Sequence, residues 1–173
     1  MVAVAANIGV SVKNLRDSCG NGLGAALLYF VCENDENGNI GIFGKAPNRE
    51  MVLISEGNTF EVLTYRGSDE QIIQKGKPTD LSFLSRERLK NREVTAASYK
   101  WNDGVSNDTL NRADGTLIVN YPGAEANLPG CKGGDCLEFM PNMAFYNCKF
   151  GEKGKKLFWE ATVRDYERKV PKF

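Results

Sequence analysis

Short runs of alternating hydrophobic and polar residues recur along the chain, and a period of two predicts β-strands with one buried face. Residues 7–13 and 60–65 follow this alternation. A continuous apolar run at 27–32 is typical of a strand that is buried on both faces. Further strands are predicted where β-branched and aromatic residues cluster, at 51–54, 72–73, 94–101, 116–121 and 143–150.

Turn residues separate these predicted strands. Asn37 and Gly38 tolerate positive φ and indicate a hairpin turn, and other loops are rich in Gly, Asn and Asp. Strands that recur roughly every 8 to 15 residues with such loops are typical of an antiparallel β-sandwich or jelly roll rather than of βαβ units. We therefore predict a mainly β protein that folds as a single domain over residues 1–173.

One or two short helices are expected beside the strands. Thr79 and Asp80 offer an N-cap for a helix that runs to about Asn91. Near the C-terminus, apolar residues at 159–170 fall at helical spacing, and Pro171 would end such a helix. Because the first residues of this region are good strand formers, we predict a strand that leads into a helix.

Composition narrows the class of protein. The 173 residues carry 22 basic and 22 acidic side chains, so the formal net charge is zero and no strong field draws the whole chain toward nucleic acid. The longest apolar run, 25–32, is far shorter than the ~18 residues of a membrane span. We expect a soluble protein with neither a nucleic-acid partner nor a membrane span, and we favour a secreted location.

The number of cysteines is odd, so at least one of the five is free or pairs between chains. Cys131 and Cys136 suit a small disulfide loop, two free thiols, or a soft-metal site that includes Cys148. A metal is not favoured, because the sequence has no second short pair of cysteines. The pairing stays open among Cys19, Cys32, Cys131, Cys136 and Cys148.

The absence of histidine is the sharpest chemical restriction. It excludes Ser-His-Asp and Cys-His catalysis, and every metal site that needs imidazole ligands. The run at 20–25 fits a permissive dinucleotide fingerprint, but no strand pattern ends directly before it. We therefore expect no cofactor and no metal, and we do not expect an enzyme.

The segment from Trp101 to Thr109 combines an aromatic residue with several short hydrogen-bonding side chains. A flat ring covers the apolar face of a sugar, while amides and carboxylates bind its hydroxyl groups. The alternative is a core tryptophan at the end of a strand, followed by a solvated loop. On the first interpretation, the ligand-binding residues are Tyr99, Trp101, Asn102, Asp103, Asn107, Asp108 and Tyr121.

Loop chemistry without a credible catalytic set predicts a non-catalytic binding module. It would recognise a carbohydrate or a protein surface through loops at one end of a β-sandwich, an architecture that lectins and many other proteins share. A structural or assembly protein, such as a coat- or shell-like jelly roll, is the first alternative. The second is a carboxylate-dependent hydrolase that uses two acids among Asp103, Asp108, Asp114, Glu125 and Asp135. The oligomeric state stays open.

Overall fold

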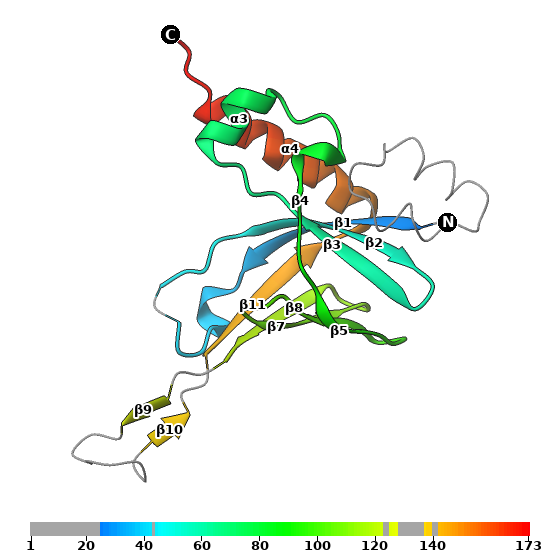
Figure 1. Ribbon diagram of the computed structural model, residues 1–173, viewed down its shortest axis with the longest axis vertical. Helices are drawn as coiled ribbons and strands as arrows, with labels where there is room; N and C mark the ends of the chain where they lie inside the picture. The colour runs from blue at the N-terminus through cyan, green and yellow to red at the C-terminus, as the bar shows by residue number, and fades with distance from the viewer. Residues whose placement is uncertain (1–24, 43, 123–124, 128–136, 140–141) are drawn as a thin grey trace.

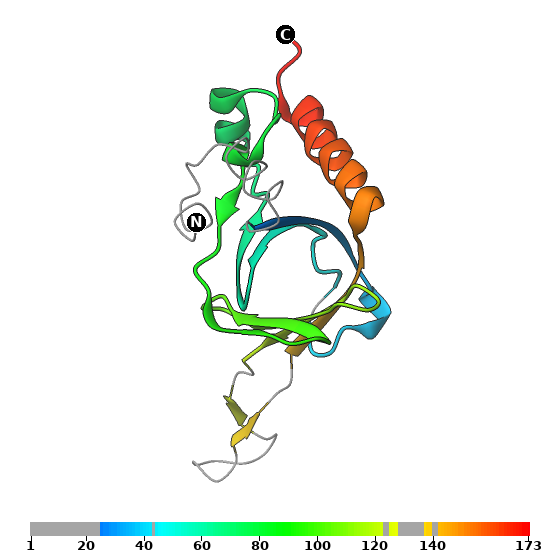
Figure 2. The same ribbon diagram turned by 90° about the vertical axis from the view of Figure 1, so that its right-hand side faces the viewer.

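The structure, a computed structural model, describes residues 25–42, 44–122, 125–127, 137–139 and 142–173 (Figure 1). Nine antiparallel strands form one strongly curled sheet, a half-barrel, and the long C-terminal helix lies outside the curl (Figure 2). The protein is therefore mainly β, with the helices on the outer side of the sheet.

Most neighbouring strands of the sheet are also neighbours in the chain, and the last strand returns to pair with the first described one. From one edge to the other, the strands are β4 (Ser85–Arg86), β3 (Thr59–Thr64), β2 (Arg49–Glu56), β1 (Ala26–Asn34), β11 (Asn142–Lys149), β8 (Thr116–Tyr121), β7 (Asn107–Asn111), β6 (Ser98–Asn102) and β5 (Lys90–Val94). The remaining elements are the separate strand pair β9 (Glu125–Asn127) and β10 (Leu137–Phe139), the 3-10 helices η1 (Glu36–Gly38) and η2 (Leu81–Phe83), and the α-helices α3 (Asp69–Lys75) and α4 (Gly151–Lys169).

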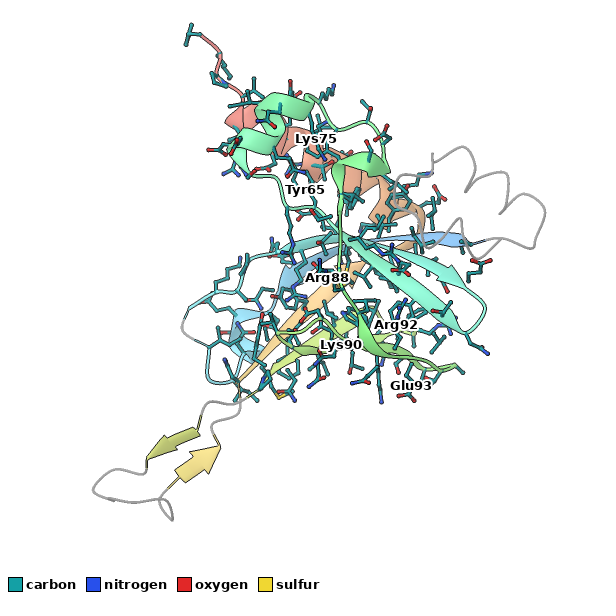
Figure 3. The ribbon with its side chains drawn as sticks, in the orientation of Figure 1. Tyr65, Lys75, Arg88, Lys90, Arg92 and Glu93 are labelled. Carbon is teal, nitrogen blue, oxygen red and sulfur yellow. A yellow bond between two sulfur atoms is a disulfide. The ribbon has the colours of Figure 1, made fainter. Side chains whose placement is uncertain are left out.

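The two edges of the sheet meet along a seam between β3 and β5. The chain passes directly from β4 at one edge to β5 at the other, and Figure 3 labels Arg88 on this connection and Arg92 on β5. Arg92 donates to the carbonyl of Phe60 at 2.9 Å and pairs with Glu61 at 3.1 Å. Glu61 also pairs with Arg86, at 2.8 Å. Side-chain bonds therefore hold the curl together where, in the described part of the chain, no backbone ladder joins β3 to β5.

Apolar side chains from the long strands fill the inside of the curl. The rings of Trp101 and Tyr99, both on β6, meet the ring of Phe60 edge-on, with centroids 5.8 and 5.2 Å apart. Burial of apolar surface drives this packing, at roughly 25 cal/mol per Å². The half-barrel therefore encloses a packed core rather than an open lumen. The other buried members of this core include Phe30, Met51, Leu53, Val62, Leu110, Leu117, Val119, Ala144 and Tyr146.

The helix α4 packs against the outer face of β1. Phe158 is fully buried there, and its ring meets that of Tyr29 at 5.4 Å between centroids. Gly154 permits the close approach, because a Cβ at this position would lie 2.7 Å from the carbonyl oxygens of Tyr29 and Lys149. A second core cluster forms at this face, which includes Ala25, Val52, Ile54, Leu63, Leu81 and Leu84.

A disulfide joins Cys32 on β1 to Cys148 on β11. The two residues are directly opposite each other in the antiparallel ladder, and both belong to the inner core. The sequence left this pairing open. Cys19, Cys131 and Cys136 lie outside the described residues.

The prediction of a mainly β, antiparallel fold is confirmed. A sandwich or jelly roll is not confirmed, because the nine strands form one curled sheet instead of two packed sheets. The strand predicted at 7–13 lies outside the described residues. Strands are present, with bounds close to the predicted ones, at 27–32, 51–54, 60–65, 116–121 and 143–150.

Three local predictions between the strands are wrong. Residues 72–73 lie in α3, not in a strand, and Ile72 is buried on the inner face of that helix turn. The helix expected at 79–91 is only η2, after which the chain extends into β4 and β5. Asn37 and Gly38 end η1 within a longer connection, so they do not form a two-residue hairpin turn.

The helix predicted near the C-terminus is present, but the strand predicted at its start is wrong, because those residues already belong to the helix. The helix α4 begins at Gly151 and is 19 residues long, so it is not short either. Gly154, Phe158 and Thr162 recur every four residues and are its buried positions, which places them on one helical face against the sheet. This burial outweighs the strand preference of the aromatic residues around Phe158.

Candidate functional site

An ion pair spans the inside of the half-barrel at the end where β2 begins. Arg49 Nη1 lies 3.2 Å from Asp108 Oδ2, and the Asp108 side chain is almost completely buried. Arg49 also donates to the hydroxyl of Tyr121 at 3.4 Å, and its guanidinium lies 5.3 Å from the centroid of the Tyr146 ring. The Arg49 guanidinium, on β2, thus contacts side chains from β7, β8 and β11.

The carboxylate of Asp103 is connected to Asp108 through the hydroxyl of Ser106. The Ser106 hydroxyl donates to Asp108 Oδ1 at 2.6 Å and lies 3.2 Å from Asp103 Oδ2. Asp103 Oδ1 accepts from the backbone N–H groups of Val105 and Ser106, both at 2.8 Å. The loop between β6 and β7 is therefore folded on its own side chains.

Burial and ion pairing shift the pKa values of Asp108 and Arg49 in opposite directions. Burial raises the pKa of Asp108, and the nearby Asp103 raises it further, although the Ser106 hydrogen bond and the Arg49 charge act in the other direction. Burial alone would lower the pKa of Arg49, but Asp108 and the two tyrosines outweigh it and raise that pKa. Arg49 is consequently a permanent cation that pairs with the buried Asp108 carboxylate.

A hollow of about 320 Å³ opens beside Arg49. Arg66 forms an ion pair with Glu87 in its wall, and Thr64 donates to the same carboxylate at 2.9 Å. The hollow is thus lined by amide, hydroxyl, carboxylate and guanidinium groups. Its polar and aromatic lining residues are Asn48, Arg49, Glu50, Thr64, Tyr65, Arg66, Glu87 and Asp103.

A larger hollow of about 630 Å³ adjoins the first beneath α4. Both hollows are lined by Asn48, Glu50 and Tyr65, so we treat them as one surface and call it the polar groove. The helix contributes charged side chains near its C-terminal end. They are Arg164, Asp165, Arg168 and Lys169.

Tyr65 lies at the centre of the polar groove, between the sheet and the helices (Figure 3). Its ring stacks on Phe83 with centroids 5.8 Å apart, and its hydroxyl is buried and interacts with the carboxylate of Asp165. Burial raises the pKa of Tyr65, and the charge of Asp165 adds to this shift. The same two influences, in the same order, raise the pKa of Glu50.

The structure brings together some of the residues predicted from sequence. Asp108 and Tyr121 meet at Arg49, and Asp103 joins them through Ser106. Nearby, the amides of Asn102 and Asn107 bond each other at 2.9 Å at the ends of β6 and β7.

The aromatic part of the prediction needs correction. Trp101 and Tyr99 are each only 4% exposed, so they do not form a surface platform for a ligand. Successive side chains of β6 point to opposite faces of the sheet. Lys100 points to the exposed face, so Tyr99 and Trp101 on either side of it point into the core. The alternative of a core tryptophan followed by a solvated loop describes Trp101 correctly.

Sequence reasoning missed Arg49, Ser106 and Tyr65. Arg49 and Asp108 are 59 positions apart, so no local motif links them. A signal was present nevertheless: Arg49 shares the period-two face of Met51 and Leu53, both fully buried. A cation on an inward face requires a buried anion as its partner.

Within the described ranges, no three side chains among His, Cys, Asp and Glu are grouped to hold a metal ion. No helix of the described part of the chain is both long and apolar enough to cross a membrane.

Comparison with protein families, with curated proteins and with solved structures finds no match to this chain. Function must therefore be inferred from the chemistry of the polar groove and of the other hollows.

Proposed function

We propose that the protein is a non-catalytic binding protein that takes a neutral, hydroxyl-rich ligand, such as a glycan, in the polar groove. The observation that carries this proposal is that the charges along the groove are largely paired. A groove with matched charges attracts charged ligands weakly but keeps many hydrogen-bonding atoms. The pairs are Arg49 with Asp108, Arg66 with Glu87, and Asp165 with Arg168 and Lys169.

The size and the lining of the groove also suit such a ligand. Its two hollows, of about 320 and 630 Å³, fall within the ~300–1,000 Å³ typical of ligand pockets. Its lining offers amide, hydroxyl and carboxylate groups, the kinds of partner that sugar hydroxyls bond.

A glycan array followed by isothermal titration calorimetry tests the proposal. Glu50→Gln changes one groove carboxyl with little change in shape, and we expect at least ~10-fold weaker binding, as for the loss of a hydrogen bond to a charged group. Glu93→Gln is the matched control, because Glu93 is exposed on β5 and does not line the groove. The proposal fails if no glycan binds, or if both variants bind as the native protein does.

One observation supports the alternative function, a carboxylate-dependent hydrolase. Asp103 and Asp108 share the Ser106 hydroxyl, and burial raises the pKa of Asp108, as a general acid would require. Burial of Asp108 behind Arg49 argues against direct contact with a substrate. Incubation of any bound glycan with the native protein and with Asp103→Asn separates the two functions. Cleavage by the native protein alone would establish the hydrolase.

The disulfide supports the proposal that the protein works in an oxidising compartment. Cys32 and Cys148 are buried in the core and paired across adjacent strands, and such disulfides persist mainly outside the reducing cytosol. Counting free thiols in protein purified under alkylating conditions tests this location. Five reactive thiols after unfolding would overturn it.

A further inference from the structure

A second hollow lies at the opposite end of the half-barrel and differs in character from the polar groove. It measures about 250 Å³ and is mostly apolar. Strand β2 connects the two ends: Arg49 begins it at the polar groove, and Ser55 near its other end contacts the Tyr99 hydroxyl at 3.3 Å. The apolar wall of this hollow is formed by Leu28, Phe30, Tyr99, Leu110 and Phe150.

Phe150 places exposed apolar surface on the rim of this hollow. It is 46% exposed although its ring lies near that of Phe30, with centroids 6.4 Å apart. The backbone at Gly115 packs closely beneath the ring, since a Cβ there would lie 2.9 Å from it. The ring is thus held at the mouth of the hollow by its surroundings, but it is not covered.

Arg112 supplies a cation at the same rim. Its guanidinium stacks 4.9 Å from the centroid of the Tyr99 ring and donates to the carbonyl of Thr95 at 2.8 Å. It forms no ion pair with a carboxylate in the described part of the chain. In the polar groove, by contrast, Arg49, Arg66, Arg168 and Lys169 are each paired with a carboxylate. The unpaired Arg112 can therefore attract an anion to this end of the molecule.

An adjoining hollow of about 410 Å³ shares Leu28 and Gly151 with the apolar hollow and extends it along the start of α4. Lys155 lines it and lies 5.7 Å from the centroid of the Tyr29 ring. Glu152 is the acidic residue in this lining. The combined surface is an apolar floor with two ring-stacked cations and one acid at its rim.

We propose that this apolar hollow binds a small aromatic carboxylate, with its rings against Phe150 and Leu110 and its carboxylate on Arg112. An apolar cavity of about 150 Å³ holds one benzene ring, so 250 Å³ suits a bicyclic ring or a ring with a short side chain. The planar guanidinium matches a carboxylate in two-point hydrogen bonding. This ligand differs in class from the neutral ligand of the polar groove, and the two sites are independent.

Titration with 2-naphthoate, followed by calorimetry and by amide shifts in NMR spectra, tests the assignment. We expect saturable binding at about 1 mM or tighter, as the efficiency of small ligands allows, with the largest shifts at Leu110, Arg112 and Gly115. No saturable binding below about 10 mM, or shifts confined to the polar groove, would overturn it.

Two variants separate the cation from the apolar wall. Arg112→Gln should weaken 2-naphthoate about 10- to 100-fold and leave the neutral 2-naphthylmethanol unchanged. Phe150→Ser should weaken both compounds. Arg88→Gln and Phe173→Ser are the matched controls, because both residues are exposed and neither lines the hollow. Equal binding of 2-naphthoate by Arg112→Gln and Arg88→Gln would reject the role of Arg112.

The site and the proposed glycan function can fail separately. Glu50→Gln should leave 2-naphthoate binding unchanged, since Glu50 lines only the polar groove. A dimer in sizing chromatography that Phe150→Ser converts to a monomer would show that a second copy of the chain covers the hollow. That result would replace the small-molecule proposal.

Discussion

Arg49 and Asp108 face each other across the inside of the half-barrel, 3.2 Å apart, although 59 positions separate them in the sequence. Their strands, β2 and β7, are not neighbours in the sheet. The pair therefore connects two walls of the curl, and it couples the stability of the sheet to the charge at one end of the polar groove.

Removing the Arg49 cation should destabilise the protein much more than neutralising the Asp108 carboxylate. Arg49→Met leaves a buried carboxylate without its counter-ion, and we expect a loss of about 3–5 kcal/mol in the free energy of unfolding near neutral pH. Asp108→Asn should cost far less, because Arg49 keeps a quarter of its side chain in solvent. Denaturant unfolding of both variants and of the double variant measures the difference. A loss from Asp108→Asn as large as that from Arg49→Met would contradict the asymmetry.

Acid should partly rescue Arg49→Met. Burial raises the pKa of Asp108 above its ordinary value of 3.8 even with Arg49 present, and loss of the cation raises it further. The native state then takes up a proton at higher pH than the unfolded chain does. The deficit relative to the native protein should therefore be largest above the raised pKa and should shrink as the pH falls toward the ordinary value. A deficit that is constant from pH 7 to about 4 would show that Asp108 is not responsible.

Asp165 on α4 should have the opposite pH dependence. Burial raises its pKa, but hydrogen bonds from Arg168 and Lys169 outweigh burial and hold the pKa below 3.8. Its contribution to stability is therefore complete above the ordinary value and is lost as the pH falls through the lowered pKa. Asp165→Asn should cost about 1 kcal/mol or less near neutral pH and nothing in strong acid. Urea unfolding at a series of pH values measures this difference, with Glu167→Gln as the control on the same helix.

Trp101→Ala tests the burial of the predicted binding residue. The ring packs on Phe60 and is 4% exposed, so we expect the substitution to cost about 3–5 kcal/mol. Lys100→Ala, at the neighbouring exposed position, should stay within about 0.5 kcal/mol of the native protein. Similar melting temperatures for the two variants would contradict the core position of Trp101.

Local pattern predicts much of the sheet but not its shape. The cluster of β-branched and aromatic residues predicted β8 at 116–121, where Leu117 and Val119 face the core and their neighbours do not. The curl depends instead on contacts between distant segments, such as Arg92 with Phe60 and Glu61. Because these contacts bridge about thirty positions without a repeated motif, sequence periodicity cannot distinguish one curled sheet from two packed sheets.

The candidate site could be predicted only in part for the same reason. Asp103, Asp108 and Tyr121 were found through their chemistry, within one segment and the strand after it. The partners that define their environment, Arg49 and Tyr65, come from β2 and the end of β3. Trp101 was misplaced because an aromatic beside polar residues has the same local sequence at a strand end in the core as on a binding surface.

Reduction of the disulfide should destabilise the whole sheet. Cys32 and Cys148 close a loop with a sequence separation of 116 residues, for which chain entropy predicts a loss of about 4–5 kcal/mol. Guanidinium unfolding with and without dithiothreitol measures this loss. The double variant Cys32→Ala/Cys148→Ala is the control, since reductant should have no further effect on it. A similar effect of reductant on the double variant would assign the stabilisation to other cysteines.

Gly154→Ala should reverse the usual effect of replacing glycine in a helix. At an exposed helical position, Ala in place of Gly stabilises by up to about 1 kcal/mol. Here the added Cβ would lie 2.7 Å from two backbone carbonyl oxygens, those of Tyr29 and Lys149. Neither oxygen can move without shifting β1 or the end of β11, so we expect a loss of about 1–3 kcal/mol, as for other overpacked sites. Lys153→Ala, at the preceding exposed position, provides the control for helix propensity. Thermal unfolding compares the two variants, and a Gly154→Ala protein as stable as Lys153→Ala would mean that α4 does not pack this closely on β1.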